Sequence, residues 1–190
     1  MIETDVRNLA TDMGREVGTA GHDDARSYIL DRLHDMGIAP YLPGGFEAGY
    51  LSDGQEFSNI LATVPGKDQS LFPVLLGAHY DTCGSLPGAD DNAAAIAVLL
   101  EVADGIRVDP TDRSVIFAFF DAEEPPHFLS PSMGSIRFFE DQRLSDIQCA
   151  VIMDLVGSVD VVVRHIAHVP IQSWQYADGF IHLTTLNDFS

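Results

Sequence analysis

Three apolar runs that each end at side chains of the metal-binding type constrain this chain more than any other feature of its sequence. The runs are residues 74–78 before His79, residues 114–120 before Glu123 and Glu124, and residues 149–153 before Asp154. Short apolar runs of this kind predict buried strands. Carboxylates directly after buried strands are costly when they stay buried and unpaired, and a metal ion removes that cost. Because core packing alone explains the repetition poorly, the sequence predicts strands that end at one metal site.

A turn-rich segment between the first two runs delivers further carboxylates. Residues 87–92 read Pro-Gly-Ala-Asp-Asp-Asn, and the mostly apolar residues that follow predict a deeply packed helix over residues 92–106. Asp91 is therefore expected where that helix begins, on the same rim as the strand ends.

Each of these motifs also has an ordinary explanation. The His79-Tyr-Asp81 segment resembles a surface turn or a simple hydrogen-bonded pair, and adjacent acids such as Glu123 and Glu124 are usually solvated. Asp-Asp-Asn is a good turn or helix cap. Their joint order, at the ends of buried runs, favours the metal site over these alternatives.

Strands alternate with helices along most of the chain. Predicted helices cover residues 22–36, 92–106 and 134–140, and predicted strands cover residues 57–64, 73–78, 115–120 and 150–153, the first two joined by a turn. This order predicts an α/β fold with a mainly parallel, mixed sheet covered by helices on both faces. Ligands of such sheets bind outside the carboxyl ends of the strands. Because no linker is evident, we expect one domain over residues 1–190.

The composition excludes several classes of partner. The formal charge of −19, from 29 acidic against 10 basic residues, argues against nucleic acid, because phosphate binding needs clustered Lys and Arg. Two cysteines are too few for a disulfide framework or a thiolate zinc cluster. The longest apolar run is far below the ~20 residues that a membrane span needs, and no secretory signal is visible. These observations predict a cytoplasmic protein without a membrane partner, and they do not predict its oligomeric state.

The chain resembles the M28 zinc peptidases, the co-catalytic di-zinc aminopeptidases. The resemblance rests on His79-Tyr-Asp81-Thr, Gly88-Ala-Asp90-Asp91-Asn92-Ala, Phe120-Asp-Ala-Glu123-Glu124 and Met153-Asp154, with Gly18-Thr-Ala-Gly-His22 and Asn59-Ile-Leu-Ala-Thr-Val-Pro-Gly66 upstream. It covers roughly residues 15–157, and the set of motifs is specific.

This resemblance implies a role for each candidate residue. His79 and Asp154 would bind one zinc ion, Glu124 would bind a second, and Asp91 would bridge the two. Asp81 would orient the His79 imidazole. Members of this family often have a cis peptide after the bridging aspartate.

The resemblance also implies a reaction. Glu123 would be the general base that activates water between the metals. The expected substrate is a peptide whose free α-amino group is held near the metals, and the expected reaction releases its N-terminal residue.

The chain departs from the family pattern after about Gly157. In the family, the second zinc normally takes a histidine from a loop well downstream of Asp154, and this chain has no such motif before Ser190. His165, His168 and His182 are expected to be ordinary strand or tail residues. We therefore expect a chain that is truncated or diverged over residues 158–190, with one firm metal position, one weak position and little peptidase activity.

Two alternatives remain open from the sequence. The segment 125–135, with its prolines and aromatic residue, and Asp154-Leu-Val-Gly157 also resemble the glutaminyl cyclases, which share the fold and use one zinc to form pyroglutamate. The acidic Asp90-Asp91-Asn92 favours the peptidase over the cyclase. A catalytically inactive scaffold is the other alternative, and the retained Glu123 argues against it.

Overall fold

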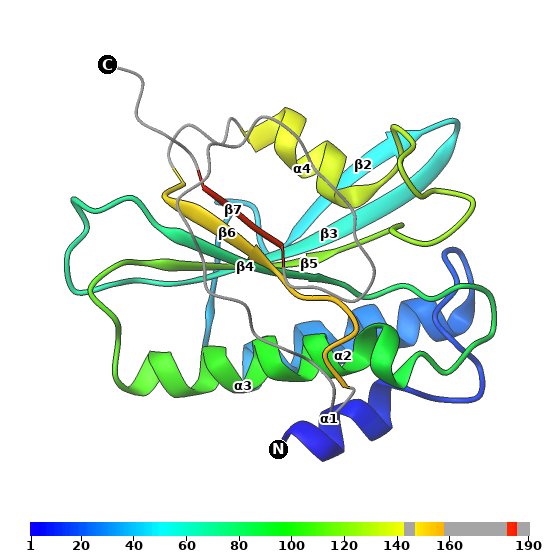
Figure 1. The fold of residues 1–190 in the computed structure, drawn as a ribbon, viewed down its shortest axis with the longest axis horizontal. Coiled ribbons are helices and arrows are strands. Elements are labelled where there is room, and N and C mark those ends of the chain that lie inside the picture. Colours follow the sequence, from blue (N-terminus) through cyan, green and yellow to red (C-terminus); the bar gives the residue numbers. More distant parts are fainter. Residues whose placement is uncertain (143–146, 158–181, 186–190) are drawn as a thin grey trace.

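The computed structural model describes residues 1–142, 147–157 and 182–185 (Figure 1). The helices are α1 (Ile2–Leu9), α2 (Ala20–Asp35), α3 (Ala94–Val108) and α4 (Gly134–Gln142), and η1 (Ala89–Ala93) is a short turn that leads into α3. The strands are β1 (Ala39–Pro40), β2 (Glu47–Ser52), β3 (Gln55–Val64), β4 (Val74–His79), β5 (Val115–Phe120), β6 (Cys149–Ile152) and β7 (His182–Thr185). They form one sheet in the order β1-β3-β5-β4-β6-β7, and β2 also pairs with β3.

The predicted mixed α/β sheet is confirmed, and its parallel pairings are confined to the centre. Strands β5, β4 and β6 run parallel, with His79 opposite Phe120 and Gly77 opposite Ile152. The flanking pairs are antiparallel. The sequence prediction missed β1 and β2; β2 alternates exposed and half-buried residues, which gives a weak apolar signal.

A short connection explains the antiparallel pairing of β2 with β3. Ser52 pairs with Gln55 across the two residues Asp53 and Gly54, which both have positive φ and so form the tight hairpin that joins β2 to β3. The predicted turn after Val64 is not a hairpin, because β5 lies between β3 and β4 in the sheet.

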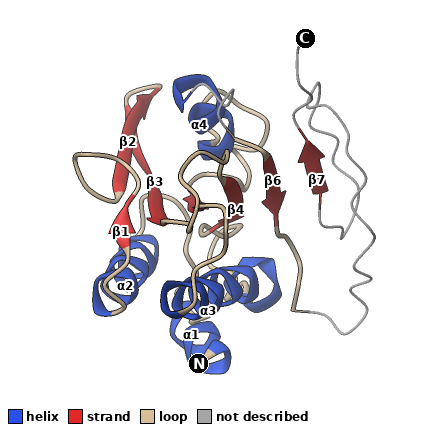
Figure 2. Ribbon diagram, turned by 90° about the vertical axis from the view of Figure 1, so that its left-hand side faces the viewer, coloured by secondary structure: helices blue, strands red, loops and turns tan. Residues whose placement is uncertain are grey.

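Helices cover both faces of the sheet, as predicted. Helices α1, α2 and α3 lie on one face and α4 lies on the other (Figure 2). Strand β5 is buried along its whole length between these layers. Helix α3 buries nearly all of its first turns, including Ile96, Leu99 and Leu100, against the sheet and α1. In the described part of the chain, no helix combines the length and hydropathy that a membrane crossing requires.

The predicted helices are present, and local hydrogen bonds and backbone angles explain why two of them begin at other residues than predicted. Helix α2 begins at Ala20, two residues earlier than expected, because the Thr19 side chain accepts a hydrogen bond from the backbone N–H of His22. Helix α3 begins at Ala94 rather than at residue 92, because Asp91 and Asn92 have non-helical backbone angles.

The buried side of α3 predicts a large stability effect for a single substitution. Leu99 is fully buried, so Leu99→Ala should lower the free energy of unfolding by about 2–5 kcal/mol through lost transfer energy and the cavity left behind. Leu51→Ala is the matched control, because Leu51 is 65% exposed and its truncation should cost under about 0.5 kcal/mol. Urea denaturation of both variants and the parent measures the difference. Equal costs would contradict the packing of α3 described here.

Candidate metal centre

His79 lies at the end of β4 and turns its imidazole into a ring of carboxylates. Its side chain is buried, and Nδ1 lies 3.2 Å from Oδ1 of Asp81. Its Nε2 lies 3.0 Å from Oδ1 of Asp91, 3.7 Å from Oδ1 of Asp154 and 3.8 Å from Oε2 of Glu123. Burial alone would lower the pKa of this imidazole, but the surrounding carboxylates, Asp154 first among them, raise it well above its usual value.

Asp81 connects the end of β4 to the loop after β5. Its Oδ1 accepts the backbone N–H of Glu123 at 3.0 Å, and its Oδ2 accepts that of Glu124 at 2.8 Å. Burial would raise the pKa of Asp81, yet the hydrogen bond with His79 and these backbone donors bring it below its usual value. Asp81 therefore sets how the imidazole and the two glutamates lie relative to one another.

Glu123 and Glu124 follow β5 after a left-handed residue, Ala122, at φ 56°. The pKa of each glutamate is raised to about 7, for Glu123 mainly by burial and for Glu124 by burial together with the charge of Asp91. Glu123 is more enclosed than its neighbour and faces His79. The rim therefore concentrates carboxylates whose mutual repulsion a bound cation would relieve.

The turn η1 carries Asp91 to the same place. The Asp91-Asn92 peptide is cis, the feature often found in the family that the sequence resembles. The Asn92 side chain donates to the carbonyl of Met153 at 2.9 Å, and Asp90 accepts the backbone N–H of Gly157 at 2.6 Å. These two bonds fasten the segment that carries Asp154 to the segment that carries Asp91.

The donor atoms fit a metal ion. Two groups, His79 with Asp91 and Asp154, and His79 with Glu123 and Glu124, each keep their ligand atoms within 4.8 Å of one another. Nε2 of His79 and Oδ1 of Asp154 are buried without a hydrogen-bonding partner in the described residues, although Nε2 lies 3.0 Å from Oδ1 of Asp91. Imidazole nitrogen and carboxylate oxygen are ligands that zinc accepts.

The structure thus brings all six sequence-predicted site residues to one rim. The three histidines considered for a fifth ligand stay outside this description: His165 and His168 lie beyond the described residues, and only the backbone of His182 is described, within β7. His127 was not considered from the sequence. Its Nδ1 lies 3.0 Å from Oγ of Ser132, and its ring packs edge-on against Phe57.

Two buried polar groups beneath the rim were also missed. Asp121, two residues before Glu123, lies 2.8 Å from Nε2 of His22 and accepts the backbone N–H of Ser58. Arg15 is buried under the loops that carry the site. Neither could be assigned from local sequence, because their partners are mostly backbone groups of distant segments.

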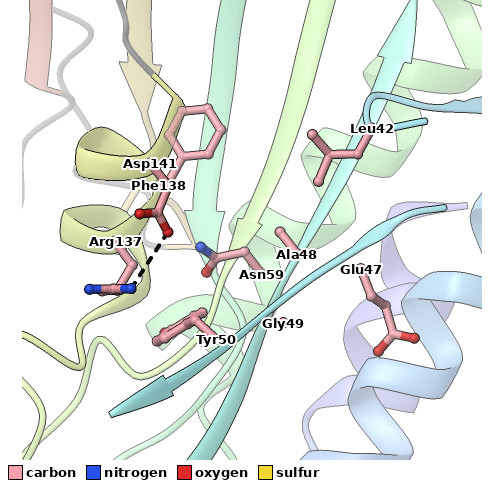
Figure 3. A pocket seen from close by; sticks show the side chains of 9 residues that line it. All are labelled: Leu42, Glu47, Ala48, Gly49, Tyr50, Asn59, Arg137, Phe138 and Asp141. Atoms are coloured by element: carbon pink, nitrogen blue, oxygen red, sulfur yellow. Dashed lines mark ion pairs between the residues drawn. The ribbon is translucent and has the colours of Figure 1, made fainter. Parts of the chain in front are cut away.

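A separate pocket of about 300 Å³ lies between β2, β3 and α4, and none of the six site residues lines it (Figure 3). Its walls include Leu42, Tyr50 and Phe138, and the Arg137 guanidinium at its edge forms an ion pair of 3.7 Å with Asp141. Asn59 connects this wall to the segment before Glu123, since its Oδ1 accepts the backbone N–H of Asp121.

Comparisons with known proteins identify the family. Residues 59–180 match the family model of Peptidase family M28. The chain belongs to this family. It is 31% identical over 135 residues to the uncharacterized protein YfbL of Escherichia coli K12, an overlap of 66% of this chain and 41% of that protein. It is 32% identical over 114 residues to endoplasmic reticulum metallopeptidase 1 of Rattus norvegicus, covering 55% of this chain and 12% of that protein.

Solved structures support the fold. A Zn-dependent exopeptidase from Parabacteroides distasonis superposes with a TM-score of 0.67 at 21% identity, over 85% of this chain and 63% of that one. The glutaminyl cyclase of Porphyromonas gingivalis superposes with a TM-score of 0.66 at 23% identity, over 85% of this chain and 60% of that one. The chain therefore spans less than two thirds of these M28 relatives and structures. The cyclase likeness concerns the fold alone, and the cytoplasmic location stays a prediction.

The convergence of ligand atoms predicts metal binding that depends on His79. The parent chain should bind zinc in a competition titration with a chromophoric chelator, and His79→Ala should abolish the tight binding, because His79 belongs to both ligand groups. His127→Ala is the matched control, since that imidazole faces Phe57 and Ser132 instead. Tight zinc binding by the His79 variant would place the metal elsewhere.

Proposed function

We propose that this chain is the catalytic part of a zinc-dependent aminopeptidase. His79 and Asp154 would hold one zinc ion, Glu124 would hold a second, and Asp91 would bridge them. The observation that carries the proposal is the orphaned, buried Nε2 of His79, which faces three carboxylates at the carboxyl edge of the parallel strands. Membership of the M28 family supports the same conclusion.

Zinc bound at these ligands would supply a Lewis acid for the scissile carbonyl and would lower the pKa of a bound water towards ~7. Glu123 is suited to move the proton. Its carboxylate faces the ligand group, and its backbone N–H is fixed by Asp81. As general base, it would accept a proton from the attacking water and donate it to the departing amine.

Asp81 and the charge of the rim would contribute two further functions, orientation of the His79 imidazole and attraction of the substrate. Asp81 forms a hydrogen bond with Nδ1 of His79, which leaves Nε2 of that imidazole for the metal. The negative charge of the rim would attract a substrate's α-ammonium group. This arrangement favours a peptide with a free N-terminus over an internal peptide bond.

A glutaminyl cyclase is the second candidate. The chain is 27% identical to the glutaminyl-peptide cyclotransferase of Drosophila melanogaster over 164 residues, 77% of this chain and 45% of that protein. The group of His79, Asp91 and Asp154 supplies three ligands, enough for a single catalytic zinc. In this reaction the α-amino nitrogen of an N-terminal glutamine attacks its own side-chain amide carbon and ammonia leaves, with Glu123 moving the proton.

Substitution of the base tests both candidates. In a form of the protein that is active, Glu123→Gln should leave the bound zinc unchanged and lower turnover by roughly 10²-fold to 10⁴-fold, because the amide cannot accept the proton. Stopped assays with leucine-terminated and glutamine-terminated peptides, together with metal analysis, provide the measurement. Glu140→Gln is the control, on the exposed side of α4.

The outcomes separate the possibilities. Release of leucine supports the aminopeptidase, and ammonia release from the glutamine peptide supports the cyclase. Loss of zinc in the Glu123 variant would make Glu123 a ligand, and an unchanged rate would remove it from the mechanism.

A further inference from the structure

Arg15 is a buried cation that binds carbonyl oxygens instead of a carboxylate. Its side chain is almost fully buried, at 1% exposure for the residue. Nε donates to Tyr80 at 2.8 Å, Nη1 to Leu9 at 2.9 Å and Pro87 at 2.7 Å, and Nη2 to Gly88 at 3.0 Å and, at the longest distance of 3.5 Å, to Asp91. Among the described residues, no carboxylate lies within ion-pair distance of it.

These carbonyls belong to the segments that carry the metal-site ligands. Tyr80 stands between His79 and Asp81 in the chain, so its carbonyl moves with both of their side chains. The carbonyls of Pro87 and Gly88 belong to the turn that leads to Asp91. One planar guanidinium therefore joins the end of β4 to the segment that presents Asp91.

The surrounding backbone is built to receive this side chain. The backbone N–H of Arg15 donates to Oγ1 of Thr82 at 2.6 Å, and the backbone N–H of Thr82 donates to the carbonyl of Arg15. Gly88 has φ 57°, and a Cβ there would collide with the carbonyl of Asp91 and press on Nη2 of Arg15. The turn approaches the guanidinium this closely because Gly88 has no side chain.

Arg15 remains a cation at neutral pH. Burial lowers its pKa to about 10, while the charges of Asp81 and Asp91 oppose that shift. Its charge thus also offsets part of the negative potential of the rim.

We propose that Arg15 is the positioning residue that sets the spacing between His79 and Asp91 in the metal site. The inference rests on the proposed function, because it requires these residues to share a metal ion. Asp91 lies on a turn and is half exposed, and its carboxylate reaches the site only where the turn is fixed against β4. Lysine cannot replace Arg15, since an ammonium lacks the rigid fork of donors that these separated carbonyls need.

The experiment compares Arg15→Lys with Arg32→Lys in the full chain. Arg32 is the matched control, because it is also largely buried, pairs with Asp5 at 2.8 Å and links α2 to α1 away from the metal site. Zinc affinity is measured by chelator competition, the visible absorption of the Co²⁺-loaded protein reports ligand geometry, and circular dichroism reports folding and melting.

The proposal predicts that Arg15→Lys folds, binds zinc about 10-fold to 100-fold more weakly and has altered Co²⁺ bands, as expected when a support of the ligands is lost. Arg32→Lys should melt earlier with unchanged zinc affinity and unchanged bands. A lower melting temperature for Arg15→Lys, with parental affinity and bands, would reduce Arg15 to a purely structural role and overturn the inference.

Two further outcomes are decisive. If Arg15→Lys does not fold, Thr82→Val removes the hydroxyl that accepts the Arg15 backbone N–H and so loosens the segment that carries the guanidinium. Unchanged zinc affinity and Co²⁺ bands in that variant would overturn the proposal. A parent chain that binds neither zinc nor Co²⁺ would overturn the proposed function itself, and this inference with it.

Discussion

The buried carboxylate of Asp81 is the interaction on which the rest of the rim depends. It contacts the imidazole of His79 at the end of β4. It also accepts the backbone N–H groups of Glu123 and Glu124, which follow β5. A fully buried carboxylate is tolerated only when such donors compensate its lost hydration. Because all three partners are candidate site groups, the hydrogen bonds that make Asp81 tolerable also orient the site.

The geometry of the parallel strands explains why the other ligands meet there. Strands β4, β5 and β6 are in parallel register, so their carboxyl ends and the residues that follow lie along one edge. The edge gathers carboxylates whose burial, and after it their mutual repulsion, raises the pKa values of both glutamates to about 7. This is the electrostatic setting in which a bound dication would stabilise the folded chain, and Arg15 is a cation that the protein itself places beside it.

Much of this arrangement could be predicted from the sequence, because in parallel strands the site residues follow closely after the apolar runs that form the strands. Glu124 and Asp154 each follow an apolar run by a few residues, and the direction of the strand then determines where they lie. The antiparallel strands were harder to predict. Strand β2 is half exposed, and the position of β5 between β3 and β4 depends on pairing between segments about fifty residues apart. The carbonyl partners of Arg15 have no sequence signature at all, because every residue has a backbone carbonyl.

The sequence by itself determined the fold class and the residues that could serve at a metal site, since these follow from apolar periodicity and from the types of side chain placed after each strand. The resemblance to the M28 family came from its specific motifs. Only the tertiary structure decided how those side chains face one another. It turned the orphaned Nε2 of His79 towards Asp91 and Asp154. It also directed His127 away, towards Ser132, and closed the loops around Arg15. These outcomes depend on packing and hydrogen bonds between distant segments, which local sequence patterns do not encode.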